Sequence, residues 1–225
     1  MNSALRDERI VRFAASDIYP VISPEFCSGR SVTDVLAGIA AGGAKVVQIR
    51  AKNDSTLDLL TLVKQCRTIT DQHKMLLIVD DRLDVALAAG ADGVHLGQDD
   101  LPVADAVQLA PDLLIGCSTH NPEEIAKAQA DGCGYLNIGP VYPTQTKSVA
   151  CGAVGLDHML DWRKAVHCPH SVMGGIKEHH LPELIRNGVR HIAMVTEITQ
   201  APDVAEKVRQ LRKYFEKQGK NLIFF

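Results

Sequence analysis

Two hydrophobic patterns alternate along the chain. Short apolar runs predict buried β-strands over residues 18–23, 45–50, 75–80, 93–96, 113–118, 135–139, 171–173 and 191–196. Between them, apolar residues recur every three or four positions. This spacing predicts amphipathic helices over residues 31–41, 56–72, 82–89, 102–110, 121–130, 156–166, 177–187 and 201–217.

Eight strand–helix units in about 200 residues predict a parallel sheet with crossover helices, and eight units close most naturally into a barrel. The expected fold class is therefore α/β, a single-domain (β/α)8 TIM barrel. An open doubly wound sheet is the alternative, but the segment after the first strand, "SPEFCSGRS", lacks its glycine-rich turn. The expected division is an N-terminal extension over 1–17, the barrel over 18–217 and a C-terminal tail over 218–225.

Composition narrows the function further. A net charge of −3 gives no electrostatic reason to expect nucleic acid or an anionic membrane as a partner. No apolar run approaches the roughly 18 residues of a membrane span, and the mixed charges of the N-terminus do not suit a secretory signal. The six cysteines have no Cys-x-x-Cys spacing, which favours reduced thiols in a cytoplasmic protein.

Charged residues gather where the predicted strands end, which is where the active sites of such barrels lie. Gln48, Arg50 and Lys52 alternate at the end of the second strand and could share one face. Two cations inside a barrel need an anionic partner, and a diphosphate suits both. Asp81 and Asp100 follow the next two strands and could hold magnesium, which accepts few carboxylates alongside water and phosphate oxygens.

A second candidate anion site follows the last strands. Gly174 and Gly175 would let backbone amides approach a phosphate, and Val195 and Thr196 follow the eighth strand. The segment "GPVYPTQTK" at 139–147 adds two threonines and a lysine after the sixth strand. Its position predicts a loop over the same rim.

Each of these residues also has an ordinary structural interpretation. Asp81 could cap the helix that follows it, and a glycine pair is often only a turn. We expect His95 to be a structural histidine near a strand end. We expect His179 and His180 to face solvent rather than a metal.

Between Tyr19 and Leu211 the chain resembles the thiamine-phosphate synthases. The resemblance rests on "VQIRAK", "DDRLDVALAAGADGVHLGQDDLP", "IGCSTH", "GPVYPTQTK", "GGI" and "VTEI". It implies a (β/α)8 transferase of thiamine biosynthesis that uses Mg²⁺. Such enzymes join 4-amino-5-hydroxymethyl-2-methylpyrimidine diphosphate to a thiazole phosphate, with or without a carboxylate, and release pyrophosphate. The implied partners are these small molecules, and the resemblance also allows a homo-oligomer.

The resemblance also implies residue roles. Asp81 and Asp100 would bind the metal, and the catalytic groups would be Arg50, Lys52, Ser118 and Lys147. The implied substrate-binding residues are Gln48, Ile49, Arg50, Ala51, Lys52, Asp80, Ser118, Thr144, Gln145, Thr146, Lys147, Gly175, Val195 and Thr196. The implied mechanism is dissociative, with a pyrimidine methyl cation attacked by the thiazole nitrogen.

One position departs from the family pattern. Members most often carry asparagine followed by aspartate, whereas this chain has Asp80 and Asp81. The extra charge beside a diphosphate would cost on the order of 4 kcal/mol at an effective dielectric constant of about 20 unless it is compensated. We expect magnesium or Arg82 to compensate it.

Two other functions remain open. A thiazole tautomerase of the same superfamily would share the barrel, with His120 as its acid–base group, but would need no diphosphate site. A non-catalytic sensor of phosphate ligands would use the barrel only for binding.

Overall fold

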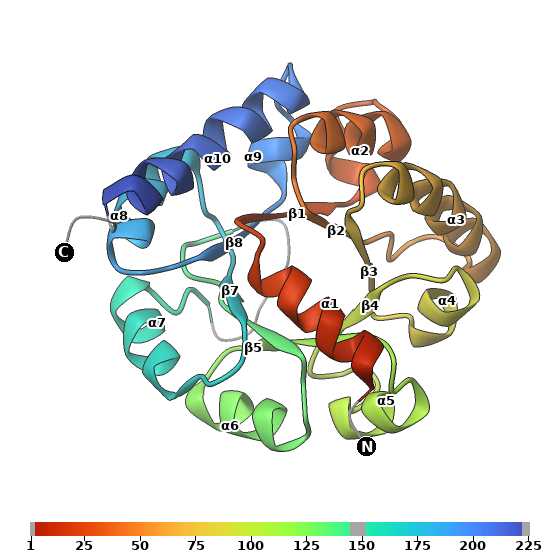
Figure 1. Ribbon diagram of the computed structural model, residues 1–225, viewed down its shortest axis with the longest axis horizontal. Helices are drawn as coiled ribbons and strands as arrows, with labels where there is room; N and C mark the ends of the chain where they lie inside the picture. Colours follow the sequence, from red (N-terminus) through yellow and green to blue (C-terminus); the bar gives the residue numbers. More distant parts are fainter. Residues whose placement is uncertain (1–2, 145–151, 222–225) are drawn as a thin grey trace.

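The computed structural model describes the backbone of residues 3–144 and 152–221. Parallel strands form a closed barrel in sequence order, with β8 paired to β1 (Figure 1). The strands are β1 (Ile18–Ile22), β2 (Val46–Ile49), β3 (Leu76–Asp80), β4 (Gly93–Leu96), β5 (Leu114–Thr119), β6 (Tyr135–Ile138), β7 (His170–Val172) and β8 (His191–Met194). The closed order confirms the predicted (β/α)8 barrel and rules out the open sheet.

All helices but the first surround the barrel, and the first crosses one end of it (Figure 1). They are α1 (Ala4–Ala14), α2 (Val32–Ala41), α3 (Thr56–Gln72), α4 (Leu83–Ala88), α5 (Val103–Leu109), α6 (Pro122–Ala130), α7 (Leu156–Trp162), α8 (Leu181–Arg186), α9 (Thr196–Thr199) and α10 (Val204–Asn221). Short 3-10 turns occupy Pro24–Phe26, Arg163–Ala165 and Glu178–His180. Most of these elements lie within a few residues of the predicted ranges.

Three predicted boundaries differ for local reasons. The last strand ends at Met194 rather than at residue 196, because Val195 leaves the extended conformation (φ −107°, ψ −92°) and Thr196 starts α9. The helix predicted over 177–187 is a 3-10 turn followed by α8, since Pro182 in the first turn of α8 has no N–H to continue the preceding turn. The helix predicted over 156–166 likewise ends as a 3-10 turn after Trp162.

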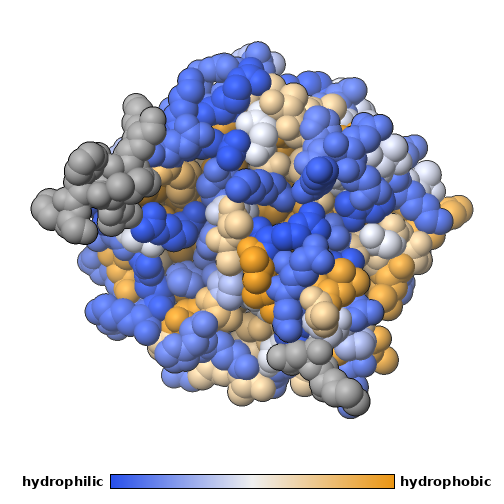
Figure 2. Space-filling model, viewed as in Figure 1, coloured by the Kyte–Doolittle hydropathy of each residue, from blue (hydrophilic) through white to orange (hydrophobic). Residues whose placement is uncertain are grey.

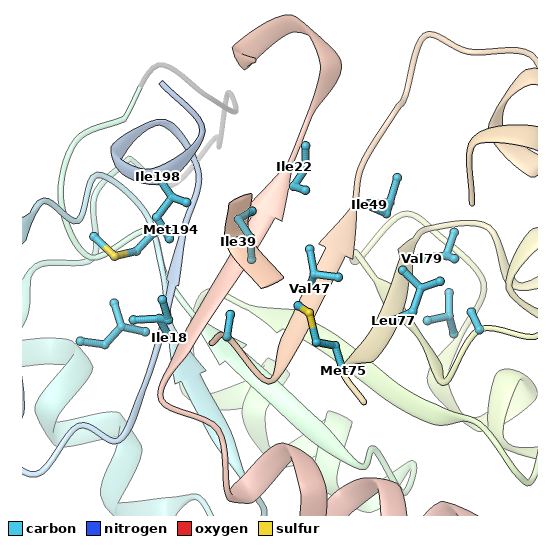
Figure 3. Packing of buried hydrophobic residues seen from close by; sticks show 14 of the residues in the cluster. Ile18, Ile22, Ile39, Val47, Ile49, Met75, Leu77, Val79, Met194 and Ile198 are labelled. Atoms are coloured by element: carbon cyan, nitrogen blue, oxygen red, sulfur yellow. The ribbon is translucent and has the colours of Figure 1, made fainter. Parts of the chain in front are cut away.

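The larger core lies between the barrel and its helices. Figure 3 shows side chains of β1, β2 and β3, such as Ile18, Val47 and Leu77, in one packed layer with the helix residue Ile39. These side chains are fully buried. Because both faces of each strand are covered, the strands read as continuous apolar runs rather than as alternating patterns.

A second, smaller core fills the inside of the barrel. Helix α1, which the hydrophobic pattern did not predict, crosses the end of the barrel that faces the viewer in Figure 1. It inserts Phe13, whose ring stacks on Tyr135 at a centroid distance of 4.1 Å and meets Tyr19 edge-on at 5.5 Å. Phe13, Tyr19 and Tyr135 are fully buried, so α1 and this ring cluster close the amino-terminal end of the barrel.

The outer face of that end is mostly polar. Figure 2 shows hydrophilic residues over most of it, with small apolar patches between them. Among the described residues, no helix has the length and apolar content to cross a bilayer.

Candidate active site

A cavity of about 520 Å³ opens at the carboxyl ends of the strands. Its walls come from most of the strand ends: Arg50 follows β2, Asp80 ends β3 and Gly175 follows β7. The polar residues that the hydrophobic pattern placed after separate strands therefore meet at one mouth.

Asp80 is the centre of a charged cluster on one wall. Gln48 Nε2 donates to Asp80 Oδ1 at 2.6 Å, and Arg50 Nε lies 3.4 Å from Oδ2. Lys52 Nζ lies 3.9 Å from the same oxygen. Arg50 is also paired with Glu25 at 3.6 Å. The Asp80 side chain is only 9% exposed, so its charge depends on these partners.

Arg82 does not compensate Asp80, contrary to the expectation from the sequence. Its guanidinium pairs with Asp84, through Nε at 2.9 Å and Nη2 at 2.6 Å, and donates to Thr56. Asp84 is the first acidic residue of α4, so this exposed pair belongs to the helix start. Gln48, Arg50 and Lys52, which contact Asp80 instead, come from β2 and the turn after it.

Asp81 and Asp100 form a second acidic pair beside this cluster. Asp81 has a left-handed backbone (φ 59°), which an aspartate adopts more readily than most residues. Its Oδ2 lies 2.8 Å from Lys52 Nζ, and its carboxyl lies beside that of Asp100, whose pKa it raises. Asp100 also accepts from the Gly97 amide at 2.7 Å. The two carboxylates that the sequence assigned to adjacent strand ends are thus in contact.

The local electrostatics agree with this geometry. Burial raises the pKa of the Asp100 carboxyl, and the neighbouring Asp81 raises it further. Burial alone would lower the pKa of Lys52, but its hydrogen bond to Asp81 and the nearby charge of Asp80 outweigh burial and raise it. An added positive charge would therefore favour the ionised form of the Asp100 carboxyl.

This observation bears on whether magnesium suits the residues. Within residues 3–144 and 152–221, no group of three or more His, Cys, Asp or Glu side chains is arranged to hold a metal. Magnesium, however, commonly takes one or two carboxylates, with the other ligands from water and phosphate. A contacting pair in which one carboxyl has a raised pKa fits that pattern.

The capping interpretation of Asp81 is wrong. Helix α4 begins after Arg82, and no side chain caps it. The Asp81 carboxylate turns instead toward Lys52 and Asp100.

Another part of the rim is built from backbone and hydroxyl groups. Gly175 has φ 64°, and a Cβ there would lie 2.4 Å from the Pro143 carbonyl oxygen. Glycine is therefore required where the loop after β7 passes under the loop after β6. Thr144 and Thr196 line the same cavity, and Lys177 Nζ donates to Thr196 Oγ1 at 3.1 Å.

The floor of the cavity is polar as well. His95 on β4 and Ser118 on β5 are buried and in contact, with His95 Nε2 2.9 Å from Ser118 Oγ. Asn137 on β6 lies beside them, and its Oδ1 is buried without a hydrogen-bond partner among the described residues. His95 was expected to be structural; it is buried, but it also faces the cavity.

The structure separates the predicted substrate residues into groups. Those that line the cavity are Gln48, Arg50, Asp80, Ser118, Thr144, Gly175, Val195 and Thr196. Those that do not are Lys52, Asp81 and Asp100, which form the adjacent acidic cluster, and the buried Ile49 and Ala51 of the outer core. Gln145, Thr146 and Lys147 lie outside the described residues.

Sequence reasoning missed Lys177 and Asn137, which also line the cavity. Lys177 follows Gly175 by two residues, and Asn137 interrupts the apolar run of β6. Each carried a weak sequence signal: Asn137 is a polar residue near the end of β6, and Lys177 is a charged residue in the loop after β7.

Histidines near the rim have different surroundings. His120 lines the cavity, and its Nδ1 lies 2.8 Å from Glu124 Oε2. His179 is exposed, as expected, whereas His180 stacks on Tyr142 at a centroid distance of 3.8 Å.

The fold and the cavity together define a (β/α)8 barrel with its polar residues at the carboxyl ends of the strands, the arrangement of enzymes with this fold. The family model described as thiamine monophosphate synthase matches residues 18–198. A thiamine-phosphate synthase of Chloroflexus aurantiacus is 41% identical over 87% of this chain and 90% of its own. One of Caldicellulosiruptor saccharolyticus is 36% identical over 93% and 95%.

Solved structures agree with the sequence comparison. Thiamine phosphate pyrophosphorylase from Pyrococcus furiosus superposes with a TM-score of 0.84 and 32% identity, over 92% of this chain and 98% of that one. The chain belongs to the thiamine-phosphate synthase family. The expected class, a transferase of thiamine biosynthesis, is thereby confirmed.

Proposed function

We propose that this chain condenses 4-amino-5-hydroxymethyl-2-methylpyrimidine diphosphate with thiazole phosphate, or its carboxylated form, to give thiamine phosphate and pyrophosphate. Family membership supports the reaction. The observation that supports the assignment to this site is that two groups of residues suited to anions meet at the mouth and beside it. One surface holds Arg50 and Lys52 beside an acidic pair, and the other holds Gly175 and Thr196 beside Lys177.

In this proposal the diphosphate lies against the first surface. Arg50 and Lys52 leave part of their contact with Asp80 and bind diphosphate oxygens, while Ser118 donates from the floor. Gln48 and the neighbouring backbone of Ile49 and Ala51 fix the position of the pyrimidine. Lys147, outside the described residues, would complete this set.

The thiazole phosphate lies against the second surface. Thr144, Thr196 and the backbone at Gly175 and Val195 would donate to its oxygens, with Gln145 and Thr146 from the same loop. Lys177 adds a positive charge there, because its ammonium group already contacts the Thr196 hydroxyl. This role for Lys177 extends the set of residues inferred from the sequence.

Asp81 and Asp100 would hold Mg²⁺. When bound, the ion would reduce the negative charge on the departing diphosphate. Its charge would also offset the three carboxyls of Asp80, Asp81 and Asp100, which outnumber the cations Arg50 and Lys52 on this wall.

The chemistry needs no nucleophile from the protein. The carbon–oxygen bond to the diphosphate breaks and leaves a cation on the pyrimidine methylene carbon; the thiazole nitrogen then supplies the electron pair of the new carbon–nitrogen bond. Arg50 and Lys52 would stabilise the leaving group, and the two anion sites would hold the partners in line. The buried floor would keep water from the cation.

The test is a coupling assay with both substrates, following pyrophosphate release with and without Mg²⁺. We expect product only with the metal, and a loss of about 100-fold or more in kcat/KM for Arg50→Met, since Arg50 would contact developing charge. Arg82→Met is the matched control. Arg82 is also an arginine just after a strand end, but its side chain contacts Asp84 and not Asp80. Equal activity of both variants would contradict the assignment of Arg50.

Asp100→Ala tests the metal site separately. We expect weaker Mg²⁺ binding by calorimetry as well as loss of coupling. Unchanged Mg²⁺ affinity would place the metal elsewhere.

The same assay decides between the remaining functions. Isomerisation of the thiazole without pyrophosphate release would favour the tautomerase, for which His120 in the cavity wall is a candidate acid–base group. Saturable binding without product would favour a sensor. A cytoplasmic location is supported by the described cysteines, Cys27, Cys66, Cys117, Cys133 and Cys168, which are free thiols. Assembly into homo-oligomers remains part of the proposal.

A further inference from the structure

A chain of hydrogen bonds runs through the inside of the barrel to the cavity. The Tyr19 and Tyr135 hydroxyls are 2.8 Å apart, and Tyr135 lies 3.0 Å from His95 Nδ1. On the other side of the ring, His95 Nε2 lies 2.9 Å from Ser118 Oγ. Four side chains from β1, β6, β4 and β5 thus connect the closed end of the barrel to the mouth.

We propose that this chain has one direction: every hydrogen points toward the cavity, and His95, as its Nε2–H tautomer, is a positioning residue that turns the Ser118 hydroxyl hydrogen toward the diphosphate. The inference rests on the proposed function and adds to it a residue that acts through Ser118. It concerns how Ser118 is oriented rather than which substrate is bound.

The direction of the hydrogen bonds follows from the surroundings of Tyr19, the residue at their closed end. Among the described residues, Tyr135 is the partner with which the Tyr19 hydroxyl forms a hydrogen bond, and Tyr19 is fully buried. If Tyr19 donates to Tyr135, its own hydrogen is satisfied and only an acceptor lone pair is left over. In the reverse direction Tyr135 donates to Tyr19, and the Tyr19 hydrogen is left buried without an acceptor. An unpaired buried donor is the less favourable of the two.

Each further bond then follows in turn. Tyr135 accepts from Tyr19, so its own hydrogen is free to donate to His95 Nδ1. A neutral imidazole that accepts at Nδ1 carries its proton on Nε2 and donates it to Ser118 Oγ. Burial raises the pKa of both tyrosines, so both hydroxyls stay protonated and able to donate.

The other forms of His95 fail the same test. With the proton on Nδ1, or on both nitrogens, the ring would donate to Tyr135. Tyr135 would then have to donate to Tyr19, which returns the unpaired hydrogen to the buried end. The fully buried ring cluster therefore selects the tautomer of a histidine that faces the cavity.

Asn137 is consistent with this tautomer after a rotation of its amide. Its Nδ2 lies 3.5 Å from His95 Nε2 and 3.3 Å from Met173 Sδ, a weak acceptor whose contact the rotation gives up, while its Oδ1 is buried without a partner among the described residues. Exchanging the two atoms by a 180° turn about χ2 brings the oxygen toward the Nε2–H donor. After the rotation, the Asn137 amide presents its oxygen, and not its N–H groups, to the Nε2–H group of His95.

A glycine fixes the place of the Tyr135 ring within this series of hydrogen bonds. A Cβ at Gly116 would lie 2.1 Å from Tyr135 Cζ and 2.4 Å from its hydroxyl oxygen. Only a glycine on β5 leaves room for the Tyr135 ring at this place. The stack of Phe13 on Tyr135 holds the opposite face of the ring.

The consequence for the site concerns charge. Ser118 has one hydroxyl hydrogen, and an anion is bound by a donated hydrogen rather than by lone pairs. Because His95 donates to Ser118 Oγ, that hydrogen stays available for a diphosphate oxygen. In the reverse direction Ser118 would spend it on His95 and would present only lone pairs to the anion.

The direct test is the tautomer itself. Nitrogen-15 NMR of the whole protein at neutral pH, with the His95 signals assigned by their loss in His95→Gln, distinguishes a protonated Nε2 from a protonated Nδ1. We expect protonated Nε2 and bare Nδ1. A proton on Nδ1 would overturn the proposal. This measurement needs no substrate, so it does not depend on the coupling activity.

The second test uses a double-mutant cycle on KM for the pyrimidine diphosphate. We expect His95→Leu to raise KM about tenfold, as for a hydrogen bond to a charged group. His95→Gln keeps an N–H donor near the Nε2 position and should restore KM to within about threefold of the original. In a Ser118→Ala background, His95→Leu should have no further effect.

The outcomes are separable. Equal effects of His95→Leu with and without Ser118 would show that His95 acts independently of Ser118 and would overturn the proposal. Absence of coupling activity in the unmodified chain would overturn the proposed function, while the NMR result would still decide the direction of the hydrogen bonds.

Discussion

Arg50 Nε lies 3.4 Å from Asp80 Oδ2 on the wall of the cavity. The carboxylate thus occupies a cation that the proposed reaction would use for a diphosphate. Gln48 and Lys52 also contact Asp80, so the charge of Asp80 is compensated within the protein before any ligand arrives. The charge of Asp80 is therefore compensated by Arg50 and Lys52, the same cations that would bind the diphosphate.

Asp80→Asn should therefore strengthen diphosphate binding. Asparagine keeps an oxygen for Gln48 but removes the charge that holds Arg50 and Lys52. We expect KM for the pyrimidine diphosphate to fall by roughly three- to tenfold. The corresponding free energy is well below the roughly 4 kcal/mol that an uncompensated like charge at about 4 Å would cost. KM for thiazole phosphate should not change. Steady-state kinetics of both substrates measure this.

The same variant should be less stable, because two cations lose a mostly buried partner. A decrease of roughly 1–3 kcal/mol in the free energy of unfolding is expected from urea denaturation. A rise in diphosphate KM would show instead that Asp80 orients Arg50 for binding.

Lys177→Met should weaken the binding of thiazole phosphate. The variant removes the ammonium group that contacts the Thr196 hydroxyl, although Glu197 at 3.5 Å already shares part of its charge. We expect KM for thiazole phosphate to rise about five- to tenfold, equivalent to about 1 kcal/mol, with kcat nearly unchanged.

Lys164→Met is the control for this substitution. Lys164 pairs with Asp161 at 3.0 Å on the exposed surface and is absent from the cavity lining. It should alter neither KM. An equal change in the KM of both substrates for Lys177→Met would point to a general disturbance of the rim.

Phe13→Ala should destabilise the barrel strongly. The Phe13 ring is fully buried against Tyr19 and Tyr135, and its removal would leave a cavity inside the barrel. We expect a loss of about 3–5 kcal/mol, measured by urea denaturation. Val11→Ala on the same helix, at 67% exposure, should stay within about 0.5 kcal/mol. Similar losses of unfolding free energy for the two variants would mean that α1 stabilises the barrel mainly through its helical backbone and not through the Phe13 ring.

Stability should depend on His191 at acidic pH. Burial lowers the pKa of His191 to about 4, against about 6.5 in an unfolded chain. The neighbouring charges of His170 and Arg190 lower it further, whereas a hydrogen bond to the Ser16 carbonyl and the charge of Asp17 oppose the shift.

The direction of the effect follows from proton binding. Between pH 6.5 and 4 the unfolded chain binds the proton and the folded chain does not, so stability falls as the pH falls through this range. The contribution is on the order of 3 kcal/mol. His191→Asn keeps an N–H donor for Ser16, and its unfolding free energy should decline less from pH 7 to 4. Parallel declines would assign the acid sensitivity to carboxylates instead.

The sequence predicted the barrel well because its signals are local. Each strand is a continuous apolar run that is buried on both faces, and the helix Thr56–Gln72 was predicted at its observed bounds. Helix α1 was missed because charged residues interrupt its apolar positions, and because Phe13 stacks on Tyr135 of β6, far along the chain, as well as meeting Tyr19 of the nearby β1.

The candidate site was predictable to the level of strand ends. That rule brought Asp81 and Asp100 together correctly, since carboxyl ends of parallel strands meet at one rim. It could not show that Arg82 turns to Asp84 while Arg50 turns to Asp80, because both arginines follow strands and only side-chain packing distinguishes them. The inward-facing Lys177 required the loop geometry around Gly175.

The helix that closes the amino-terminal end also limits how substrates and products can reach the cavity. With Phe13, Tyr19 and Tyr135 filling the interior, the mouth is the only route along the barrel axis for the described part of the chain. In the proposed reaction, both substrates would then enter, and both products leave, through the mouth of the cavity. The molecule whose anion site lies deeper would have to enter first and leave last, so the depth of each anion site would set the order of arrival and departure.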